Sequence, residues 1–578
     1  MTRLFSKRCL LSVAVCAALF GIACDSSDDD TVAGAQATVT AGSETSSPAP
    51  GESPSASASP DDESPLPGDN PFTPDDAVLT VAIKDPATLD PMLVGDPGSA
   101  LVARQLFEGL TKWSPARGEV VPAAAQSWKV EDGGATFVFK LREGMTFHDG
   151  SPVTAGDFVF AFDRIAKRKN ASDLAYVLQR VKGFSKVNQI GSTDHLEGLT
   201  AVNDGTLRIE LDEPDQDFPA VLTHPGLVPL PRAAVENESE FLQQPVGNGS
   251  FQMAGRWDVG GELFLEAYDD AVESPQLDGL RLIPYPESAA SWLDFIEGEL
   301  DVAEVPAGQI VDAGERYGRD NYTPLMNSYS FGFNLGKKGF QNLKLREAIN
   351  RAIDRQTISQ VVYKGILQSP RGIVPPGMPG FKEDVCTQLC EHSKKAARKL
   401  VSKVPNKLRK VKLEYPDEKP HSEVAGLVRG DLKRAGLRVT LKAYRFKDFF
   451  KLLQDEDQSM FRLTWIAEYP SPDAYLGSLF ESSSVDNHTG FESKNVDKLL
   501  TKARATEKPN KRLKLYQKAE KAILKQAPIV PLGYFRAFWA TQPEVSGLRI
   551  DATGGFDAAT VVLDTDTEQA GEDAEGEE

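Results

Sequence analysis

The sequence predicts an α/β protein built from more than one lobe. The chain has 578 residues, too many for a single hydrophobic core, so two to four lobes are expected. Its composition, 40% hydrophobic and 26% charged, is typical of a soluble globular protein. Strand and helix patterns also alternate through residues 326–532, as an α/β lobe requires.

The net charge of −20 is concentrated at the two ends of the chain. Residues 1–24 carry a charge of +3, residues 25–76 hold twelve acids and no base, and residues 564–578 hold eight acids and no base. The body, residues 77–563, therefore has a net charge of only −3. Because no basic stripe dominates it, we expect no nucleic-acid partner.

The first 24 residues have the pattern of a secretory signal. Three basic residues precede an apolar run over 9–23, which is too short to cross a bilayer as a stable helix. The run is followed by Cys24 and resembles the lipobox of bacterial lipoproteins, in which a small residue precedes a cysteine that is lipidated after cleavage. Gly21 stands where that box usually has leucine, so a plain secretory signal is the alternative. We predict that Cys24 carries a lipid.

The next segment, residues 25–76, consists almost entirely of Ser, Ala, Pro, Asp, Gly, Glu and Thr. With so few large apolar side chains it cannot bury a core, which predicts a disordered tether. A lipid on Cys24 and a long tether place the body outside the cytoplasm, at a membrane surface that it does not enter. Residues 564–578 are predicted to be a second disordered, acidic tail.

The body begins with a predicted strand over Val78–Ile83. Further along, Asp132–Gly134 is typical of a hairpin turn and Thr136–Leu141 of a strand. Thr154, with Asp157 three residues later, predicts the N-cap of a helix with one apolar face.

The turn at His148 and Asp149 does not predict catalysis. Adjacent side chains in a turn diverge, and no nucleophile or set of metal ligands accompanies them. The chain also lacks the HExxH, GxSxG and Walker patterns. We therefore expect no enzymatic activity, no cofactor and no bound metal.

The stretch 461–480 is the predicted ligand site. Large apolar residues alternate at its start, which predicts a strand, residues 469–473 are typical of a turn, and Ala474–Phe480 can form a helix. Arg462 and Glu468 are six residues apart, so in an extended segment both face one side. Such a cation and anion can hold the two ends of a zwitterion. The alternative is an ordinary ion pair on a surface strand.

Several stretches of the body together resemble one known family. They are 122–165, 202–235, 244–253 (QPVGNGSFQM), 333–358 and 533–539 (GYFRAFW). In this order they resemble the family 5 extracellular solute-binding proteins, the peptide-binding subunits of ABC importers, and above all the oligopeptide-binding members. The resemblance covers nearly all of the body.

The resemblance implies a type II-like periplasmic binding protein with two hinged α/β lobes and an extra domain inserted in the first. Lobe I would comprise about 77–107, 232–325 and 533–563. The inserted domain would be 108–231, and lobe II 326–532. A ligand would be enclosed between the lobes.

The same resemblance implies site residues. In the oligopeptide-binding proteins an aspartate in a W-x-A-D-Y segment pairs with the peptide's amino terminus, and Glu468 in WIAEY stands at its position with one more methylene. Ile466 of this segment is also expected to contact the ligand. Arg462 matches an arginine that meets a peptide carboxylate, and Phe446 falls where a tryptophan commonly lines the pocket.

Two more contacts are implied in the first lobe. Gly95 and Asp96 match a segment whose backbone pairs with the peptide, although an aspartate is unusual there.

Two cysteines remain in the body, Cys386 and Cys390. An isolated pair outside the cytoplasm is expected to form a disulfide, which at this spacing closes a small loop. A metal site that includes His392 is the weaker alternative.

The expected function is that of a lipid-anchored, monomeric receptor that captures oligopeptides and delivers them to the permease subunits of an ABC transporter. Its partners would be the peptide, the permease and the membrane surface. One alternative is the same fold binding another solute, such as a nickel chelate, haem, an opine or an oligosaccharide, since fold alone does not choose a ligand. A sensor lipoprotein without transport is another.

Overall fold

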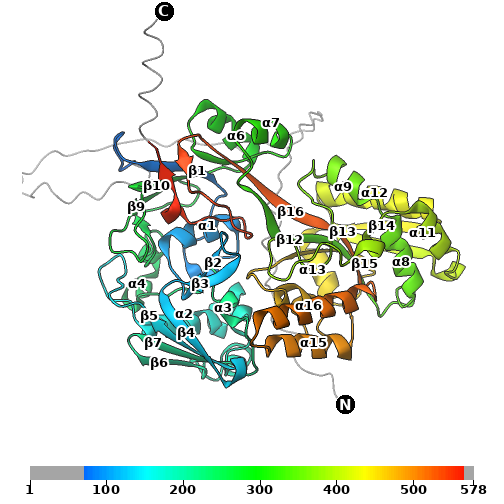
Figure 1. Ribbon diagram of the computed structural model, residues 1–578, viewed down its shortest axis with the longest axis horizontal. Coiled ribbons are helices and arrows are strands. Elements are labelled where there is room, and N and C mark those ends of the chain that lie inside the picture. The colour runs from blue at the N-terminus through cyan, green and yellow to red at the C-terminus, as the bar shows by residue number, and fades with distance from the viewer. Residues whose placement is uncertain (1–69, 565–578) are drawn as a thin grey trace, which may run out of the picture.

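The computed structural model describes residues 70–564, and within them the largest element is a mixed sheet of ten strands (Figure 1). The strands lie in the order β14-β13-β15-β12-β16-β11-β1-β10-β9-β8. Their bounds are β1 (Val78–Ile83), β8 (Phe251–Met253), β9 (Leu263–Ala267), β10 (Gly279–Pro284), β11 (Val302–Glu304), β12 (Tyr322–Phe333), β13 (Lys410–Pro416), β14 (Arg438–Tyr444), β15 (Met460–Ile466) and β16 (Ile529–Thr541).

Two long strands, β12 and β16, join the two halves of this sheet (Figure 1). The first half holds β11, β1, β10, β9 and β8, and the second half holds β15, β13 and β14. Strands β12 and β16 pair antiparallel with each other, and their register shifts between Pro324 and Ser328. On one side β16 pairs with β11, and on the other side β12 pairs with β15. The chain therefore passes twice between the halves, once in each long strand.

Helices cover both faces of the second half, and each face has its own apolar core. One core includes side chains of α8 (Leu343–Ala352), α9 (Arg355–Val361), α11 (Lys394–Val401) and α12 (Lys419–Ala435). This core continues into the first half, where it includes side chains of α6 (Ser288–Glu297). The other includes α13 (Phe446–Gln454), α14 (Asp473–Phe480), α15 (Lys494–Arg504) and α16 (Pro509–Leu524). Strand β15 separates them, because Met460 belongs to the first core, and Phe461 and Leu463 to the second.

A separate four-stranded sheet lies within residues 108–231, the segment predicted to be an inserted domain and called the insert below. Its order is β4 (Ala125–Glu131), β5 (Thr136–Leu141), β7 (Thr206–Glu210) and β6 (Leu199–Asn203). The insert also contains β2 (Thr111–Ser114), β3 (Glu119–Pro122), α2 (Ala155–Ala166) and α3 (Phe218–Val221). Phe137 and Phe139 of the insert share one apolar core with Leu79 and Val81 of β1.

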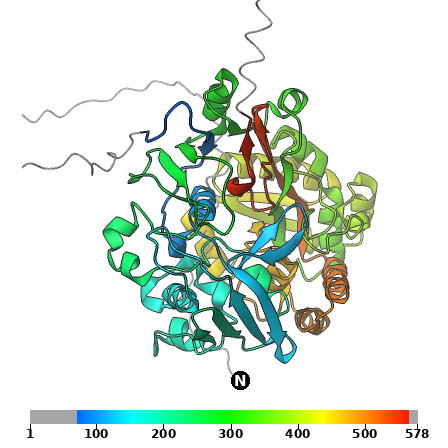
Figure 2. The same cartoon turned by 60° about the vertical axis from the view of Figure 1, so that its left-hand side comes forward.

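The first half of the large sheet carries the remaining elements. They are α1 (Pro97–Leu106), α4 (Arg232–Glu236), α5 (Glu238–Phe241), α7 (Ile310–Arg316) and the paired strands β17 (Val545–Ser546) and β18 (Val562–Leu563), while α10 (Thr387–Cys390) lies in the second half. After β16 the chain returns to the half that holds β1, where Val545 and Ile550 join the same core as Leu79 (Figure 2).

Local sequence patterns correctly predicted several elements. Strands β1 and β5 have the predicted bounds, and the turn at Asp132–Gly134 joins the antiparallel strands β4 and β5. Thr154 is the N-cap of α2, where its backbone N and its Oγ1 each donate to Asp157 Oδ2 at 2.7 Å. The predicted strand and helix in 461–480 correspond to β15 and α14.

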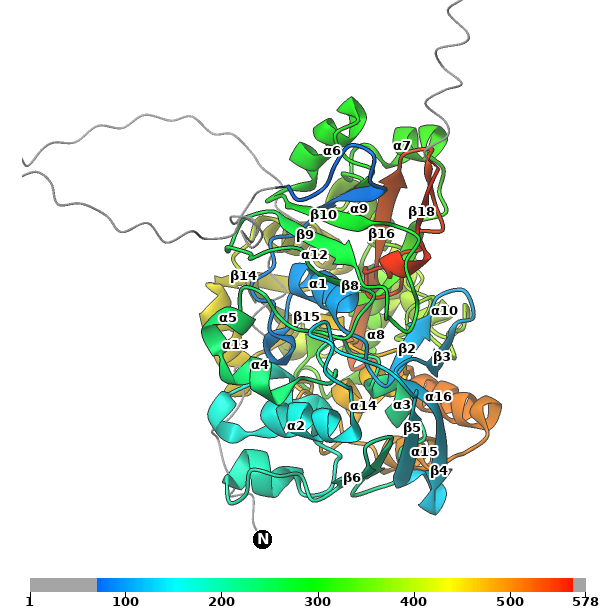
Figure 3. The same cartoon turned by 90° about the vertical axis from the view of Figure 1, so that its left-hand side faces the viewer.

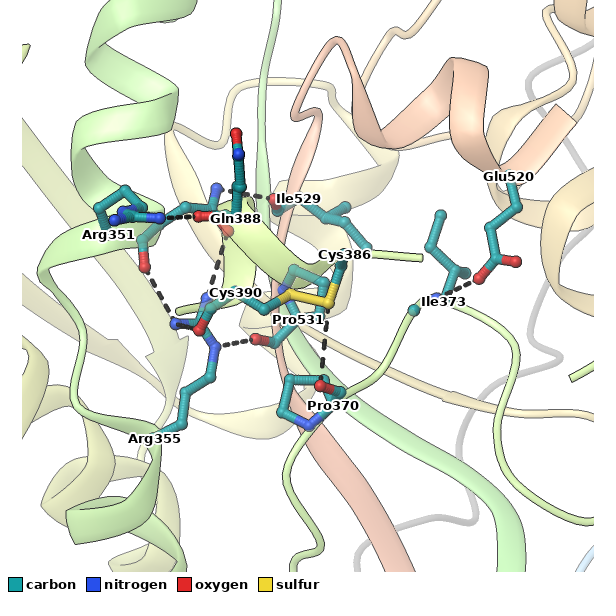
Figure 4. Close-up of a disulfide and its surroundings, with 12 residues drawn as sticks. Arg351, Arg355, Pro370, Ile373, Cys386, Gln388, Cys390, Glu520, Ile529 and Pro531 are labelled. Atoms are coloured by element: carbon teal, nitrogen blue, oxygen red, sulfur yellow. Dashed lines mark hydrogen bonds between the residues drawn. A yellow bond between two sulfur atoms is a disulfide. The ribbon is translucent and has the colours of Figure 1, made fainter. Parts of the chain in front are cut away.

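A disulfide joins Cys386 and Cys390 at the edge of the second half (Figure 4). The nearly buried Arg355 donates from Nη1 to the Cys390 carbonyl at 2.9 Å and from Nε to the Pro531 carbonyl of β16 at 2.6 Å. The guanidinium has no carboxylate partner here, and burial lowers the pKa of Arg355 to about 9. Arg355 thus ties the disulfide loop to one of the two crossing strands.

The predicted signal peptide, the Cys24 lipidation site, and most of the tether and the acidic tail lie outside the described residues. Across residues 70–564, no helix is both long and apolar enough to pass through a bilayer.

Candidate functional site

Glu468 lies just after β15, in a turn that two hydrogen bonds hold. The Ala467 backbone N donates to the Met326 carbonyl of β12 at 2.8 Å. The Trp465 indole Nε1 donates to the Ala474 carbonyl of α14 at 2.7 Å. Trp465 therefore has a structural role, and its ring packs against the core formed by α13–α16.

The Glu468 carboxylate faces the insert rather than its own lobe. Its Oε2 lies 3.8 Å from Nε2 of His224, and this oxygen is buried although the side chain as a whole is 34% exposed. His224 Nδ1 accepts the backbone N–H of Gly226 at 3.0 Å, which places the ring proton on Nε2. Burial and the charge of Arg104 lower the pKa of His224 to about 3, so the imidazole is neutral at physiological pH.

Glu468 therefore lacks a positive partner. Oε2 has no hydrogen-bond partner among the described residues. Burial raises the pKa of Glu468 to about 7. The Asp486 carboxylate also raises it, whereas a hydrogen bond from the Tyr176 hydroxyl lowers it. An incoming ammonium group would relieve this arrangement, because it would supply both the charge and the donors that the carboxylate lacks.

Arg462 is buried in β15, on the face covered by α12. Its residue exposure is 9%, and no carboxylate lies within ion-pair distance of it in the described part of the chain. Burial and the positive charge of Arg462 lower the pKa of His421 to about 3. The same charge opposes the rise that burial causes in the pKa of Tyr329 and of Tyr363. The Tyr329 hydroxyl and His421 Nδ1 are 3.1 Å apart.

Three buried polar atoms on this face have no hydrogen-bond partner within the described residues. They are Arg462 Nε, Thr464 Oγ1 and Asn327 Oδ1. In the β12–β15 register Asn327 is opposite Ile466, so all three side chains belong to the same face of two adjacent strands. Buried polar atoms are normally paired with protein, water or ligand, so these three atoms are candidates for contact with a polar ligand. Thr464 and Asn327 cannot be grouped with Arg462 from the sequence alone, because their proximity depends on the register of β12 and β15.

The structure places Arg462 and Glu468 in different surroundings. Strand β15 ends at Ile466, so the alternation of side chains used to predict a common face reaches Ile466 but not Glu468. The titratable neighbours of Arg462 are in the second half, and those of Glu468 include His224 and Tyr176 of the insert. That both face one ligand stays a prediction.

The two other residues predicted in the second half are partly exposed. Ile466 is the last residue of β15. Phe446 is the first residue of α13, and its ring contacts Phe450 edge-on, with 4.7 Å between ring centroids.

Asp96 has a structural role that explains its presence. It is the N-cap of α1, where its Oδ1 accepts the Ser99 backbone N–H at 2.8 Å and its Oδ2 accepts the Ser99 hydroxyl at 2.5 Å. Gly95, just before it, is exposed.

A small pocket opens at the C-terminal ends of β1 and β11. Lys84 and Glu304, 3.8 Å apart, are among its lining residues, as are Trp539 and Leu101. Leu101 lies on α1, one turn before Arg104, the residue whose charge acts on His224. Helix α1 therefore connects this pocket to the surroundings of Glu468. Strand ends of this kind are a common position for ligands in α/β folds.

A second cavity lies on the face of β15 opposite to the Arg462 side chain, between Trp465, Ser328 and Tyr534. Neither cavity is lined by Glu468.

The residues considered for other chemistry have structural partners. His148 Nδ1 accepts the Gly247 backbone N–H at 3.1 Å, and burial lowers the pKa of His148 to about 4. Between residues 70 and 564 no group of three His, Cys, Asp or Glu side chains is arranged to hold a metal.

Comparison with known proteins shows one consistent similarity. The family model of the bacterial extracellular solute-binding proteins, family 5 (middle), matches residues 119–487. The chain is 28% identical over 500 residues to the oligopeptide-binding protein OppA of Bacillus subtilis, which covers 82% of this chain and 91% of the relative. It is 30% identical over 479 residues to the probable deoxycholate-binding periplasmic protein YgiS of Escherichia coli, covering 80% and 89%.

The fold is similar to solved structures as well. The unliganded open form of the murein tripeptide-binding protein MppA matches with a TM-score of 0.74 and 24% identity, over 85% of this chain and 98% of that one. This similarity confirms the predicted α/β fold class.

Proposed function

The chain belongs to the bacterial extracellular solute-binding proteins of family 5, and on this premise we propose that it captures short peptides by their free amino terminus and delivers them to a membrane permease. One observation carries the proposal: Glu468 is a carboxylate that faces the insert with an unpaired Oε2 and a neutral histidine beside it. A peptide ammonium is the partner with the matching charge and donors.

Arg462 supplies a complementary site for the other end of the peptide. It is a buried cation without a carboxylate partner in the described part of the chain, next to the unpaired Thr464 and Asn327 oxygens. A carboxylate would pair with the guanidinium, and the amide groups of a peptide backbone can donate to these oxygens. His421 joins the same group of candidates, because it lies within the field of Arg462.

The relatives support this function in part. OppA of Bacillus subtilis is named as an oligopeptide-binding protein, whereas the equally similar YgiS is named as a probable deoxycholate-binding protein. Deoxycholate has a carboxylate and an apolar body but no ammonium. It would use Arg462 and leave Glu468 unpaired, so it is the second candidate ligand.

The decisive test compares ligands that have a free amino group with ligands that lack one. Calorimetry with tri-alanine, N-acetyl-tri-alanine and deoxycholate separates the two candidates, and mass spectrometry of material that co-purifies with the native protein identifies the natural ligand. We expect tri-alanine to bind and its acetylated form to bind at least about tenfold more weakly, because acetylation removes the charge that pairs with Glu468. Equal affinity for both peptides, or binding of deoxycholate alone, would contradict the proposal.

Anchoring and delivery belong to the same proposal. A lipid on Cys24 would keep the receptor, as a monomer, at the membrane that holds its permease. The support for this is the sequence of the amino terminus and the extracellular character of the family.

A further inference from the structure

Charged side chains form the contact between the insert and the second half of the sheet. Asp473, the first residue of α14, accepts from Arg504 Nε at 3.0 Å on both carboxylate oxygens. It also accepts from Nη2 of Arg180, a residue of the insert, at 2.9 Å. Arg180 Nη1 in turn donates to Asp215 Oδ2 at 2.9 Å. Asp473 is only 3% exposed, so these bonds are largely shielded from water and salt.

A second set of bonds lies beside the first. Asp217 of the insert accepts from the Tyr516 hydroxyl at 2.9 Å and from the Ser471 hydroxyl at 3.0 Å, both on its Oδ2. Its Oδ1 lies 2.8 Å from Arg512 Nε. We call the whole group the clasp. It consists of Arg180, Asp215 and Asp217 from the insert and Ser471, Asp473, Arg504, Arg512 and Tyr516 from the second half.

The clasp differs in kind from the contact that the insert makes with the first half. There, Phe137 and Phe139 of the insert share a continuous apolar core with β1. Figures 1 and 3 show β4 and β5 beside α15 and α16, where the Gln216 backbone N donates to the Arg504 carbonyl at 2.9 Å. A polar joint can break and re-form with less loss than an apolar core, because water replaces its hydrogen bonds.

The clasp is directly connected to the candidate ligand site. Ser471 and Asp473 follow Glu468 by three and five residues in the same turn. Tyr176, whose hydroxyl group hydrogen-bonds to Glu468 and lowers its pKa, precedes Arg180 by four residues. The two segments that meet at Glu468 are thus the segments that the clasp ties together.

We propose that Arg180 and Asp217 are positioning residues for ligand capture. By holding the Glu468–Asp473 turn against the insert, they keep the Glu468 carboxylate beside Tyr176 and His224 and favour the arrangement in which the two halves enclose a ligand. The part of this inference that concerns a ligand rests on the proposed function. The part that concerns the clasp does not.

The ligand-free protein tests the clasp itself. Arg180→Met removes the charge and keeps most of the side-chain length, and the fold of the second half keeps the Arg504–Asp473 pair. Arg208→Met is the matched control, because Arg208 is an arginine of the same insert whose partners, Glu131, Asp132 and Glu210, all lie in the insert. We expect hydrogen exchange of residues 467–476 to accelerate at least about tenfold in Arg180→Met and to stay unchanged in Arg208→Met. Unchanged exchange in both variants would overturn the proposal.

Two further variants separate positioning from general stability. Asp217→Asn removes the second set of bonds alone and should give the same local acceleration. Arg180→Lys keeps the charge but not the two-armed contact, so partial recovery is expected. Acceleration spread evenly over the whole insert, with no recovery in Arg180→Lys, would contradict a positioning role.

Tri-alanine provides the ligand readout. We expect Arg180→Met to weaken its binding about tenfold, mainly through faster dissociation. Equal affinity in the wild type and Arg180→Met would overturn the proposed link to capture. If the wild type does not bind tri-alanine but Arg180→Met accelerates exchange, the clasp is supported and the peptide function is contradicted.

Discussion

Glu468 Oε2 and His224 Nε2 face each other at 3.8 Å, a distance too long for a hydrogen bond. His224 has little capacity to become a cation, since burial and Arg104 lower its pKa to about 3. The pair is therefore a carboxylate beside a neutral donor, and the carboxylate keeps its need for a cation. This geometry makes Glu468 the most informative position to change.

We predict that Glu468→Gln weakens the binding of free-amine peptides by at least about tenfold. The substitution keeps the size of the side chain and leaves a bound ammonium without its anion. Calorimetry with tri-alanine measures the effect, and Glu143→Gln, at an exposed position, is the matched control. Equal affinities of wild type and Glu468→Gln would remove Glu468 from the site.

Peptide affinity should also depend on pH. Burial raises the pKa of the unliganded Glu468 carboxyl to about 7, and a bound ammonium would lower it, so the peptide binds the deprotonated form. Protonation of Glu468 then competes with binding below pH 7, so affinity should rise by roughly 15-fold between pH 5.5 and pH 7. Affinity should fall again above about pH 8, where the α-amino group of the peptide loses its own proton.

Titration calorimetry across this range, with the release of protons measured in buffers of different ionisation enthalpy, checks the prediction. Asp486, whose pKa burial raises to about 6, lies near Glu468 and titrates in the same range. Glu468→Gln separates the two groups, because its affinity should vary much less with pH. An equally steep profile in this variant would assign the effect to Asp486.

Local patterns in the sequence were sufficient for several elements of the fold and for part of the site, whereas the two-lobed architecture was inferred from the family resemblance. The bounds of β1 and β5 and the Thr154 cap follow from neighbouring residues, and those predictions are confirmed. The strand and turn around Glu468 were predicted in the same way. These features depend on interactions within a few residues, which a single sequence displays directly.

The remaining features depend on partners that are distant in the chain. Arg180 and Asp473, for example, are 293 residues apart, and nothing near either residue indicates the other. The unpaired oxygens of Asn327 and Thr464 become related only through the register of β12 and β15. Asp96 is different, because its capping role depends on Ser99, only three residues later in the chain.

Asp96→Ala should lower stability without affecting binding. The carboxylate caps α1 through Ser99, so its loss is expected to cost about 1 kcal/mol of unfolding free energy. Chemical unfolding measures this cost, and Asp96→Asn, which keeps a capping oxygen, should recover most of it. A weakened affinity for tri-alanine at unchanged stability would instead support the predicted ligand contact at this position.

Removing the disulfide should destabilise the second half moderately. A loop closed over so few residues contributes about 2 kcal/mol in the chain-entropy view. The double variant Cys386→Ser, Cys390→Ser and the reduced wild type should therefore unfold at similarly lower urea concentrations. Peptide affinity should change little, because Arg355 still ties the loop to Pro531 of β16. A large loss of affinity with no loss of stability would show that the loop takes part in binding.

Cys24→Ser should release the protein from the membrane. Three basic residues, a short apolar run and a small residue before Cys24 predict lipidation, and a lipid is the one feature of residues 1–24 that could keep a cleaved receptor on a membrane. Sedimentation of cell membranes after expression measures the bound fraction, and metabolic labelling with a fatty acid detects the lipid itself. A Gly21→Leu variant, closer to the usual box, serves as the control and should remain bound. If Cys24→Ser still sediments with membranes and the wild type takes up no label, the alternative of a plain secretory signal is correct, and the receptor meets its permease from solution.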